Sequence, residues 1–307
     1  MVSSIGTASA RTRRRGGLRR HEAIEGWLFV APIMLGLLVF TYGPTLASFV
    51  MSLMRWDGLT PPSFVGLDNY VTLLTSDDVY GRSLANTAYF AVGSVPLSML
   101  FGLGMALLVN QKVPGVTLFR ALFFLPVVTS SVAIGLVWAW MFSSYYGVIN
   151  GVLNLVGIPS LPWLGSVAWA MPAVIIVSIW YRVGYDMVLF LAGLQGIPEQ
   201  LYEAAKIDGA NNWQLFRHVT LPLLSPTTFF ILIISVIGSF QVFNIIYVMT
   251  KGGPGYATSV YIYYLYQTAF QHFKMGYGSA MAFVLFVLLA GLTLIQWKAA
   301  SRWVFYR

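Results

Sequence analysis

The 307-residue chain has no cysteine and very little charge. Without cysteine it can form no disulfide framework, no thiolate metal site and no cysteine nucleophile. Only 9% of its residues are charged, against about 25% in an average soluble domain, whereas 58% are hydrophobic and 16% are aromatic. This composition excludes a soluble globule and predicts an integral membrane protein, whose aromatic residues suit the two membrane interfaces.

Sequence patterns for ATP binding and for hydrolysis are also absent. No lysine follows a glycine, so the P-loop signature G-x-x-x-x-G-K-[ST] is missing, as are H-E-x-x-H and G-x-S-x-G. The three histidines, His21, His218 and His272, lie in three different segments, each without a second ligand nearby. We therefore expect no catalytic residue, metal site or cofactor in this chain, and an intramembrane enzyme is disfavoured.

Six apolar stretches are long enough to cross a bilayer, which takes about 20 residues of helix. They are Glu25–Leu53, Leu84–Asn110, Phe119–Phe142, Val167–Leu194, Pro226–Met249 and Ser279–Lys298. The predicted fold is therefore all-α and integral to the membrane, with six transmembrane helices. Residues 1–24 form a basic N-terminal tail, and residues 25–307 form the six-span domain.

The distribution of basic residues predicts the orientation. With the N-terminus inside, thirteen basic residues fall on the cytoplasmic side: Arg11, Arg13, Arg14, Arg15, Arg19, Arg20, Lys112, Arg120, Lys206, Arg217, Lys298, Arg302 and Arg307. Four fall outside, Arg55, Arg82, Lys251 and Lys274, and Arg182 lies within a span. Cytoplasmic loops of membrane proteins are enriched in Lys and Arg, so both termini are predicted to be cytoplasmic. The same rule explains the net charge of +8 without a nucleic-acid partner.

Loop Ser143–Ser166, on the predicted outer side, carries no charged residue. We expect a membrane-surface helix or a re-entrant segment there, with Trp163 as its anchor in the interface.

One span contains an acid and a base at helical spacing. Asp186 follows Arg182 by four residues, one helical turn, so the two side chains can neutralise each other. Two interpretations stay open: a structural pair that makes one polar spot tolerable in the membrane, or a polar patch on a substrate path. A single paired carboxylate is weak support for an ion relay.

A polar segment interrupts the apolar chain between the fourth and fifth spans. Pro198 can begin a helix, and Gly209 can end it as a C′ glycine does. The helix has small residues along one face, which let another surface approach closely. The run "NNWQLFRHV" begins a second short helix with an asparagine cap, and Pro222 and Pro226 mark the start of the fifth span. The sequence thus predicts a cytoplasmic helix–Gly–helix hairpin, either an ordinary interfacial helix or a docking site for a partner.

The segment "EAAKIDGANNWQLFRHVTLP" resembles the signature motif of bacterial ABC-importer permeases. Glu203-Ala204-Ala205, Gly209 and Leu221-Pro222 match that motif, and Val219 stands where isoleucine is usual. The flanking "LFLAGLQGIPEQLYEAAKIDGA" and "FNIIYVMTKGGPGYATSVYIYYLYQTAF" resemble the carbohydrate-uptake branch of maltose and glycerol-phosphate type. The resemblance extends from about Trp27 to the C-terminus.

The resemblance implies a role for each part of this segment. The residues expected to couple to an ATPase are Glu203, Ala204, Ala205, Asp208, Gly209 and Ala210. Glu203 would engage basic groups on that subunit, the two alanines would allow close packing, and Gly209 would permit the sharp turn. The implied partners are a cytoplasmic ATPase dimer that binds ATP and Mg, a second homologous permease and an extracytoplasmic substrate-binding protein.

The resemblance also suggests a substrate path. Positions that line the maltose site of a related permease correspond to Ser178, Arg182, Tyr185, Ser239, Gln241 and Val242. The residue types mostly differ, with Arg182 in place of a glycine and Val242 in place of an asparagine, so the resemblance transfers the position and not the contact. Adding polar and aromatic neighbours, the predicted path residues are Ser178, Arg182, Tyr185, Asp186, Ser239, Phe240, Gln241 and Asn244. Bundle packing is the alternative role for each of them.

The predicted function is a permease subunit that takes up a sugar or sugar-like solute across a bacterial inner membrane. Within the same class, a glycerol-phosphate importer is the alternative, because Arg182 could serve an anionic substrate if Asp186 did not cancel its charge. From another class, the alternative is an ion-coupled secondary transporter that uses Asp186.

Overall fold

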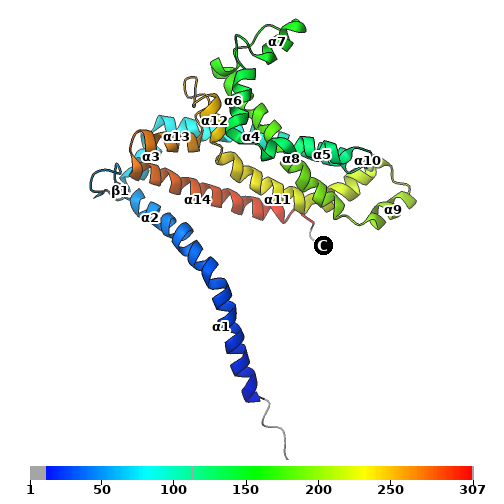
Figure 1. The fold of residues 1–307 in the computed structure, drawn as a ribbon, viewed down its shortest axis with the longest axis horizontal. Coiled ribbons are helices and arrows are strands. Elements are labelled where there is room, and N and C mark those ends of the chain that lie inside the picture. The colour runs from blue at the N-terminus through cyan, green and yellow to red at the C-terminus, as the bar shows by residue number, and fades with distance from the viewer. Residues whose placement is uncertain (1–11, 112–113, 306–307) are drawn as a thin grey trace, which may run out of the picture.

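The computed structural model describes residues 12–111 and 114–305 and shows a long helical bundle (Figure 1). Three of the basic residues used for orientation, Arg11, Lys112 and Arg307, lie outside the described residues. The α-helices are α1 (Thr12–Leu37), α2 (Gly43–Ser52), α3 (Asp68–Thr75), α4 (Asp78–Val109), α5 (Val116–Val128), α6 (Ser131–Met141), α7 (Val148–Leu155), α8 (Val167–Gln195), α9 (Glu199–Ile207), α10 (Asn212–Leu215), α11 (Leu221–Phe240), α12 (Asn244–Met249), α13 (Tyr261–Tyr266) and α14 (Met275–Ala300). Shorter elements are the helical turns η1 (Leu38–Tyr42), η2 (Trp163–Gly165), η3 (Phe216–Thr220) and η4 (Gln267–Gln271), and the paired strands β1 (Met54–Arg55) and β2 (Ser63–Phe64).

Five helical runs in the described part of the chain are long and apolar enough to cross a membrane. They are Glu22–Ser52, Asp78–Val109, Val167–Gln195, Asn212–Met249 and Met275–Ala300. Each covers one of the predicted spans to within one residue, so the all-α membrane fold is confirmed. The first run begins three residues before the predicted span, and α1 itself begins at Thr12, inside the predicted tail.

The third predicted span is wrong as a single helix. Residues 116–141 form α5 and α6, which meet at an angle of 96° and count as a sixth span only if taken together. Pro126 weakens the last turn of α5 because it has no N–H to donate, and Thr129 then adopts an extended conformation (φ −85°, ψ 148°). Apolar periodicity alone does not register such a break.

The fifth predicted span also differs from its expected form. The helical run begins at Asn212 and continues through Pro222 and Pro226, so these prolines do not mark its start. Pro222 occupies the first turn of α11, where a proline is tolerated. The break comes later, over residues 241–243 between α11 and α12.

The α1 helix extends away from the other helices (Figure 1). The most apolar 18 residues of Glu22–Ser52 include none that is buried within the described part of the chain. The helix is joined to the bundle through α2, where Phe49 packs on Phe283 of α14 with ring centroids 4.8 Å apart. Nearly the whole apolar surface of α1 is therefore free to contact lipid or another subunit.

Polar contacts hold helix ends together at the end of the bundle opposite α9 and α10. Asp77 accepts the backbone N–H of Tyr80 at 2.9 Å and so caps α4. The hydroxyls of Tyr264 and Tyr277 both donate to its other oxygen, at 2.7 and 2.6 Å. Burial, and then the hydrogen bond to Asp77, raise the pKa of Tyr264 above the ordinary tyrosine value. This network joins α4, α13 and α14.

Trp163 is not the interfacial anchor expected from the sequence. The loop does contain a short helix, α7, but the Trp163 side chain is only 8% exposed. Its indole N–H donates to Asn150 at 2.9 Å, and its ring packs on Phe142 and Trp169. The tryptophan therefore closes the base of the loop instead of projecting from it.

Candidate transport pathway and coupling segment

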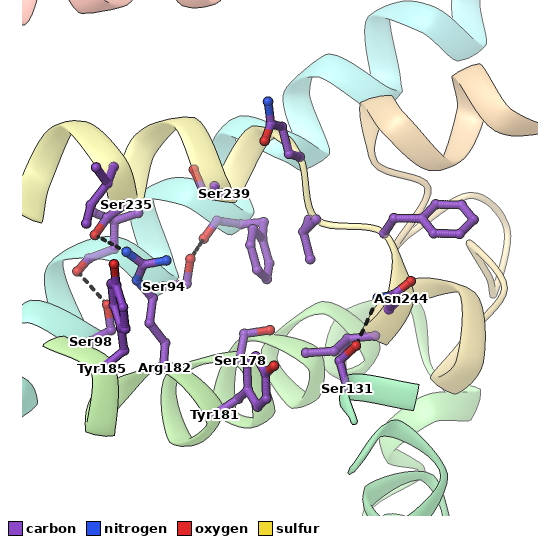
Figure 2. A pocket seen from close by; sticks show the side chains of 18 of the residues that line it. Ser94, Ser98, Ser131, Ser178, Tyr181, Arg182, Tyr185, Ser235, Ser239 and Asn244 are labelled. Carbon is purple, nitrogen blue, oxygen red and sulfur yellow. Dashed lines mark hydrogen bonds between the residues drawn. The ribbon is translucent and has the colours of Figure 1, made fainter. Parts of the chain in front are cut away.

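A cavity of about 510 Å³ lies among α4, α8, α11 and the break between α11 and α12 (Figure 2). Three helices each contribute two polar residues separated by four positions, so that both face the same side of their helix. The pairs are Ser94 and Ser98 on α4, Ser178 and Arg182 on α8, and Ser235 and Ser239 on α11. The cavity therefore has a polar wall within an apolar bundle.

Serine hydroxyls in this wall are hydrogen-bonded to the backbone of their own helices. Ser94 donates to the carbonyl of Phe90 at 2.7 Å, and Ser178 donates to that of Val174 at 2.8 Å. Such bonds satisfy the hydroxyl proton while the oxygen keeps its capacity to accept a further hydrogen bond. These two serines can therefore accept hydrogen bonds from hydroxyl groups while their own protons stay bonded to the backbone.

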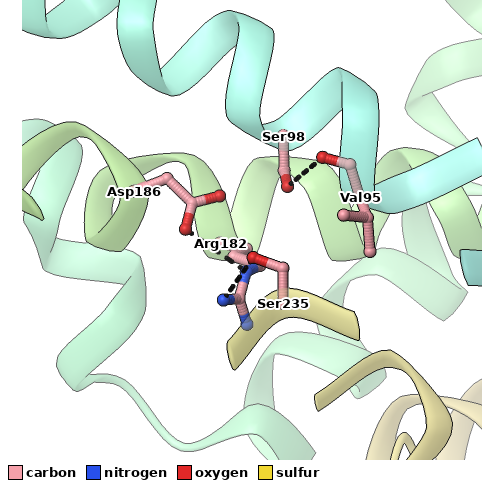
Figure 3. A network of polar contacts seen from close by, with 5 residues as sticks. All are labelled: Val95, Ser98, Arg182, Asp186 and Ser235. Atoms are coloured by element: carbon pink, nitrogen blue, oxygen red, sulfur yellow. Dashed lines mark hydrogen bonds and ion pairs between the residues drawn. The ribbon is translucent and has the colours of Figure 1, made fainter. Parts of the chain in front are cut away.

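Arg182 extends from α8 to α11 across the cavity wall. One terminal nitrogen, Nη2, donates to Ser235 Oγ at 2.8 Å, while Nε lies 3.3 Å from Asp186 Oδ1 (Figure 3). The guanidinium carbon lies 5.7 Å from the centre of the Tyr185 ring, within the range of a cation–π interaction. Among the described residues that line the cavity, Arg182 is the one with a formal charge.

The non-helical stretch after α11 forms the other side of the cavity. Gln241, Val242 and Phe243 all line it. Asn244 begins α12 and donates to Ser131 of α6 at 2.9 Å, which connects this stretch to the bent α5–α6 pair. Both breaks in the predicted spans therefore contribute residues to the cavity, as expected where irregular backbone lines a path through a membrane protein.

A second candidate site is the hairpin of α9 and α10 at one end of the bundle (Figure 1). Gly209 joins the two helices. Its φ of +84° is a left-handed conformation that is unfavourable for most residues other than glycine and asparagine. Asn211 caps α10: its side chain accepts from Gln214 N at 2.9 Å, and the Gln214 side chain accepts from Asn211 N at 2.8 Å. The turn is thus determined by one glycine and one capping box.

The protein-family model for the inner membrane component of binding-protein-dependent transport systems matches residues 98–301. The chain belongs to this family. The probable ABC transporter permease protein YesP of Bacillus subtilis (strain 168) is 40% identical over 291 residues, which cover 94% of each chain. The lactose transport system permease protein LacF of Rhizobium radiobacter is 37% identical over 295 residues, covering 94% of this chain and 98% of the relative.

A solved structure shows the same fold. It comes from a bacterial ABC transporter involved in the import of the acidic polysaccharide alginate, with a TM-score of 0.81 and 24% identity. The match covers 94% of this chain and 99% of the other. The resemblance to ABC permeases is therefore confirmed, and the chain is a multi-pass inner membrane transport subunit.

The structure brings most of the predicted path residues of this permease to one cavity. Those that line it are Ser178, Arg182, Tyr185, Ser239, Gln241 and Asn244. Two do not. Phe240 points into an apolar core with Tyr261 and Met281, because it follows Ser239 on the helix and faces away. Asp186 is fully buried behind Arg182.

Several lining residues of this permease were missed from the sequence. They are Ser94, Ser98, Ser131, Tyr181, Ser235 and Phe243. The repeated spacing of four between serines on α4 and on α11 was an available signal, because it puts two hydroxyls on one helix face. Ser131 and Phe243 carry no such signal, since they lie at helix breaks.

Two exposed apolar side chains on the hairpin were also missed. Ile207 is 86% exposed at the end of α9, and Trp213 is 65% exposed in α10. Glu203 and Ala204 are exposed on the same hairpin, and Ala205 is half-buried. These exposed apolar side chains make the hairpin a candidate surface for another protein.

Proposed function

We propose that this permease imports a sugar or sugar-like solute delivered by an extracytoplasmic binding protein. ATP hydrolysis on a cytoplasmic ATPase dimer, which binds the ATP and Mg, drives the movement. A second, homologous permease completes the pathway. The complex resides in a bacterial inner membrane, and both termini of this chain are cytoplasmic.

The hairpin from Glu203 to Gly209 carries the proposal of ATPase coupling. It is exposed, it has an apolar tip at Ile207, and its turn depends on the left-handed backbone of Gly209. In this arrangement Glu203 meets basic groups of the ATPase, Ala204, Ala205 and Ala210 admit its surface closely, and Asp208 leads into the turn. A rigid hairpin can transmit a movement of the ATPase to α8 and α11, because it connects those two helices directly.

The cavity supports a sugar as the solute. Its serine hydroxyls and the amide groups of Gln241 and Asn244 match the donors and acceptors of sugar hydroxyls. Tyr181, Tyr185 and Phe243 supply aromatic surface. The volume lies in the range of ligand sites for small molecules, and a relative of 37% identity is a lactose transport permease.

Two alternatives have less support. An ion-coupled transporter would need an accessible intramembrane carboxylate, whereas Asp186 is fully buried and paired with Arg182. A glycerol-phosphate importer would need a strong cationic site, whereas Arg182 shares its charge with that carboxylate.

Cross-linking tests the coupling surface, and the absence of cysteine makes single-cysteine variants unambiguous. Ile207→Cys in the assembled complex is expected to form a bismaleimide cross-link with a cysteine placed on the ATPase surface. Leu155→Cys is the matched control, because Leu155 is 87% exposed on α7, far along the chain from the hairpin. Equal cross-linking of both variants, or none at Ile207→Cys, contradicts the proposed docking.

Uptake into cells that express the binding protein, with radiolabelled mono- and disaccharides, tests the rest. ATP depletion should abolish uptake, while a protonophore that leaves ATP intact should not. Gly209→Pro should abolish uptake, because proline cannot adopt positive φ, whereas Gly209→Asn should retain most of it. Uptake that survives ATP depletion but not the protonophore would favour the ion-coupled alternative.

A further inference from the structure

The Arg182–Asp186 pair is arranged asymmetrically about the cavity. Arg182 lines the cavity, and 27% of its side chain is exposed, whereas Asp186 has no exposed surface and no place in the lining. A solute in the cavity therefore meets the guanidinium and not the carboxylate. The pair presents its positive end to the path and keeps its negative end in the wall.

Asp186 is enclosed by the packing of α4 on α8. At Gly102 of α4, an added Cβ atom would lie 2.7 Å from the Cβ of Asp186, so only a glycine fits there. Ser98, one turn earlier on α4, lies beside the carboxylate (Figure 3). Neither Asp186 oxygen has a hydrogen bond of good geometry within the described structure. The ion pair with Arg182 is therefore the main compensation for a buried carboxylate, which would otherwise be costly.

The other groups that hold the guanidinium do not contribute to compensating its charge. Ser235 Oγ accepts from Nη2, and Gly238 of α11 lies against Nη1, since a Cβ there would be 3.4 Å from that nitrogen. Both neighbours are neutral. The charge balance of the cavity thus depends on the one carboxylate behind Arg182.

We propose that Asp186 is a specificity-determining residue that sets the charge of solute the path accepts. It acts through Arg182, so it is a positioning and charge-balancing residue. With Asp186 ionised, the pair has no net charge, and a neutral sugar and an acidic sugar bind with similar affinity. Without that charge, the path presents an uncompensated cation in a low-dielectric site and selects a sugar that bears a carboxylate. The inference rests on the proposed function, because it takes the cavity as the solute path.

Two probes that differ in one group provide the test. D-galactose and D-galacturonate share their ring hydroxyls and differ in a hydroxymethyl group against a carboxylate. Binding of each to the purified complex in nanodiscs, without the binding protein, is measured by saturation-transfer difference NMR at millimolar concentration. The readout is the ratio of the galacturonate affinity to the galactose affinity. A merely structural role of the pair would weaken both probes alike and leave this ratio unchanged.

A pair of variants separates the charge of the pair from its packing. Asp186→Asn gives a net charge of +1, whereas wild type and the double variant Arg182→Gln/Asp186→Asn give 0. The expected ratio is raised about tenfold in Asp186→Asn and unchanged in the double variant. If Asp186→Asn does not assemble, Asp186→Ser gives the same charge of +1 with a smaller side chain and decides in its place.

Two results would overturn the inference. One is an equal ratio in all assembled variants while both sugars bind, which leaves the proposed function intact. The other is a double variant that behaves like Asp186→Asn, because the effect would then not depend on the cation. If neither sugar binds the wild-type complex and no labelled sugar is taken up, the proposed function fails and the inference fails with it.

Discussion

At the scale of single residues, the closest contacts between helices depend on glycine. Gly184 on α8 faces α5 so closely that an added Cβ would overlap the backbone oxygen of Phe123. Backbone cannot move aside as a flexible side chain can, so α5 and α8 would have to separate. Small residues at helix contacts are a general feature of membrane bundles, where close van der Waals packing supports association.

Gly184→Ala is therefore expected to lower the melting temperature of the purified complex by several degrees, because it forces α5 away from α8. Overpacking of this kind costs about 1–3 kcal/mol. Gly104→Ala on α4 is the matched control, since its added Cβ meets nothing within 4 Å. That variant should be neutral or slightly stabilising, because alanine favours helix by about 1 kcal/mol. Equal melting temperatures for the two variants would contradict the close approach.

At the scale of elements, the same backbone features that interrupt helices form the sites. The α5–α6 bend places Ser131 beside Asn244, and the break after α11 places Gln241 and Phe243 in the cavity. The turn at Gly209 separates α9 from α10 and creates the exposed hairpin. Regular helices supply the framework, and the interruptions supply residues of the cavity and the turn of the exposed hairpin.

Asn211→Ala should weaken the hairpin, because it removes the side chain that caps α10. Loss of an N-cap costs about 1 kcal/mol, so ATP-driven uptake is expected to fall severalfold while the complex still assembles. Asn211→Asp keeps a capping oxygen and should retain near-normal uptake. Uptake per assembled complex is the measurement, and an unchanged value for Asn211→Ala would show that the cap is not needed for coupling.

At the scale of the whole molecule, the bundle has two chemically different ends. One end carries the α9–α10 hairpin with Lys206, Arg217 and the cap at Asn211. The other carries β1, β2 and the Asp77 network. The distribution of basic residues predicts that the first end faces the cytoplasm, as the proposed docking of a cytoplasmic ATPase requires.

Labelling of single cysteines in intact cells tests that orientation. A membrane-impermeant maleimide should label Tyr145→Cys, which replaces a side chain 96% exposed before α7. It should label Ile207→Cys only after the cells are permeabilised. Cysteine-free wild type is the background control. Labelling of Ile207→Cys in intact cells would contradict the predicted topology and place the hairpin outside the cell.

The sequence predicted helix positions better than helix shapes. The span over Val167–Leu194 matches α8 within one residue, and the span over Leu84–Asn110 matches α4 except that α4 begins six residues earlier, at Asp78. Long apolar runs can be located without tertiary information. The bend between α5 and α6 was missed, since Thr129 and Ser130 are ordinary in a membrane helix and their extended backbone depends on packing. Phe240 was predicted to line the path but lies in the apolar core. The sequence of α11 does not show which face of the helix packs on the core, because the neighbouring helices decide this.

By itself, the sequence determined the membrane class and the expected number of spans, and it predicted the orientation and the hairpin around Gly209. Composition, charge bias and the Glu203–Gly209 motif are properties of the sequence, so they can be recognised without knowing how the helices pack. Only the tertiary structure decided which face of each helix meets the cavity and which member of the Arg182–Asp186 pair lines it. The reason is physical: a spacing of four puts two side chains on one side of a helix, but the neighbouring helices determine whether that side faces the path or the wall.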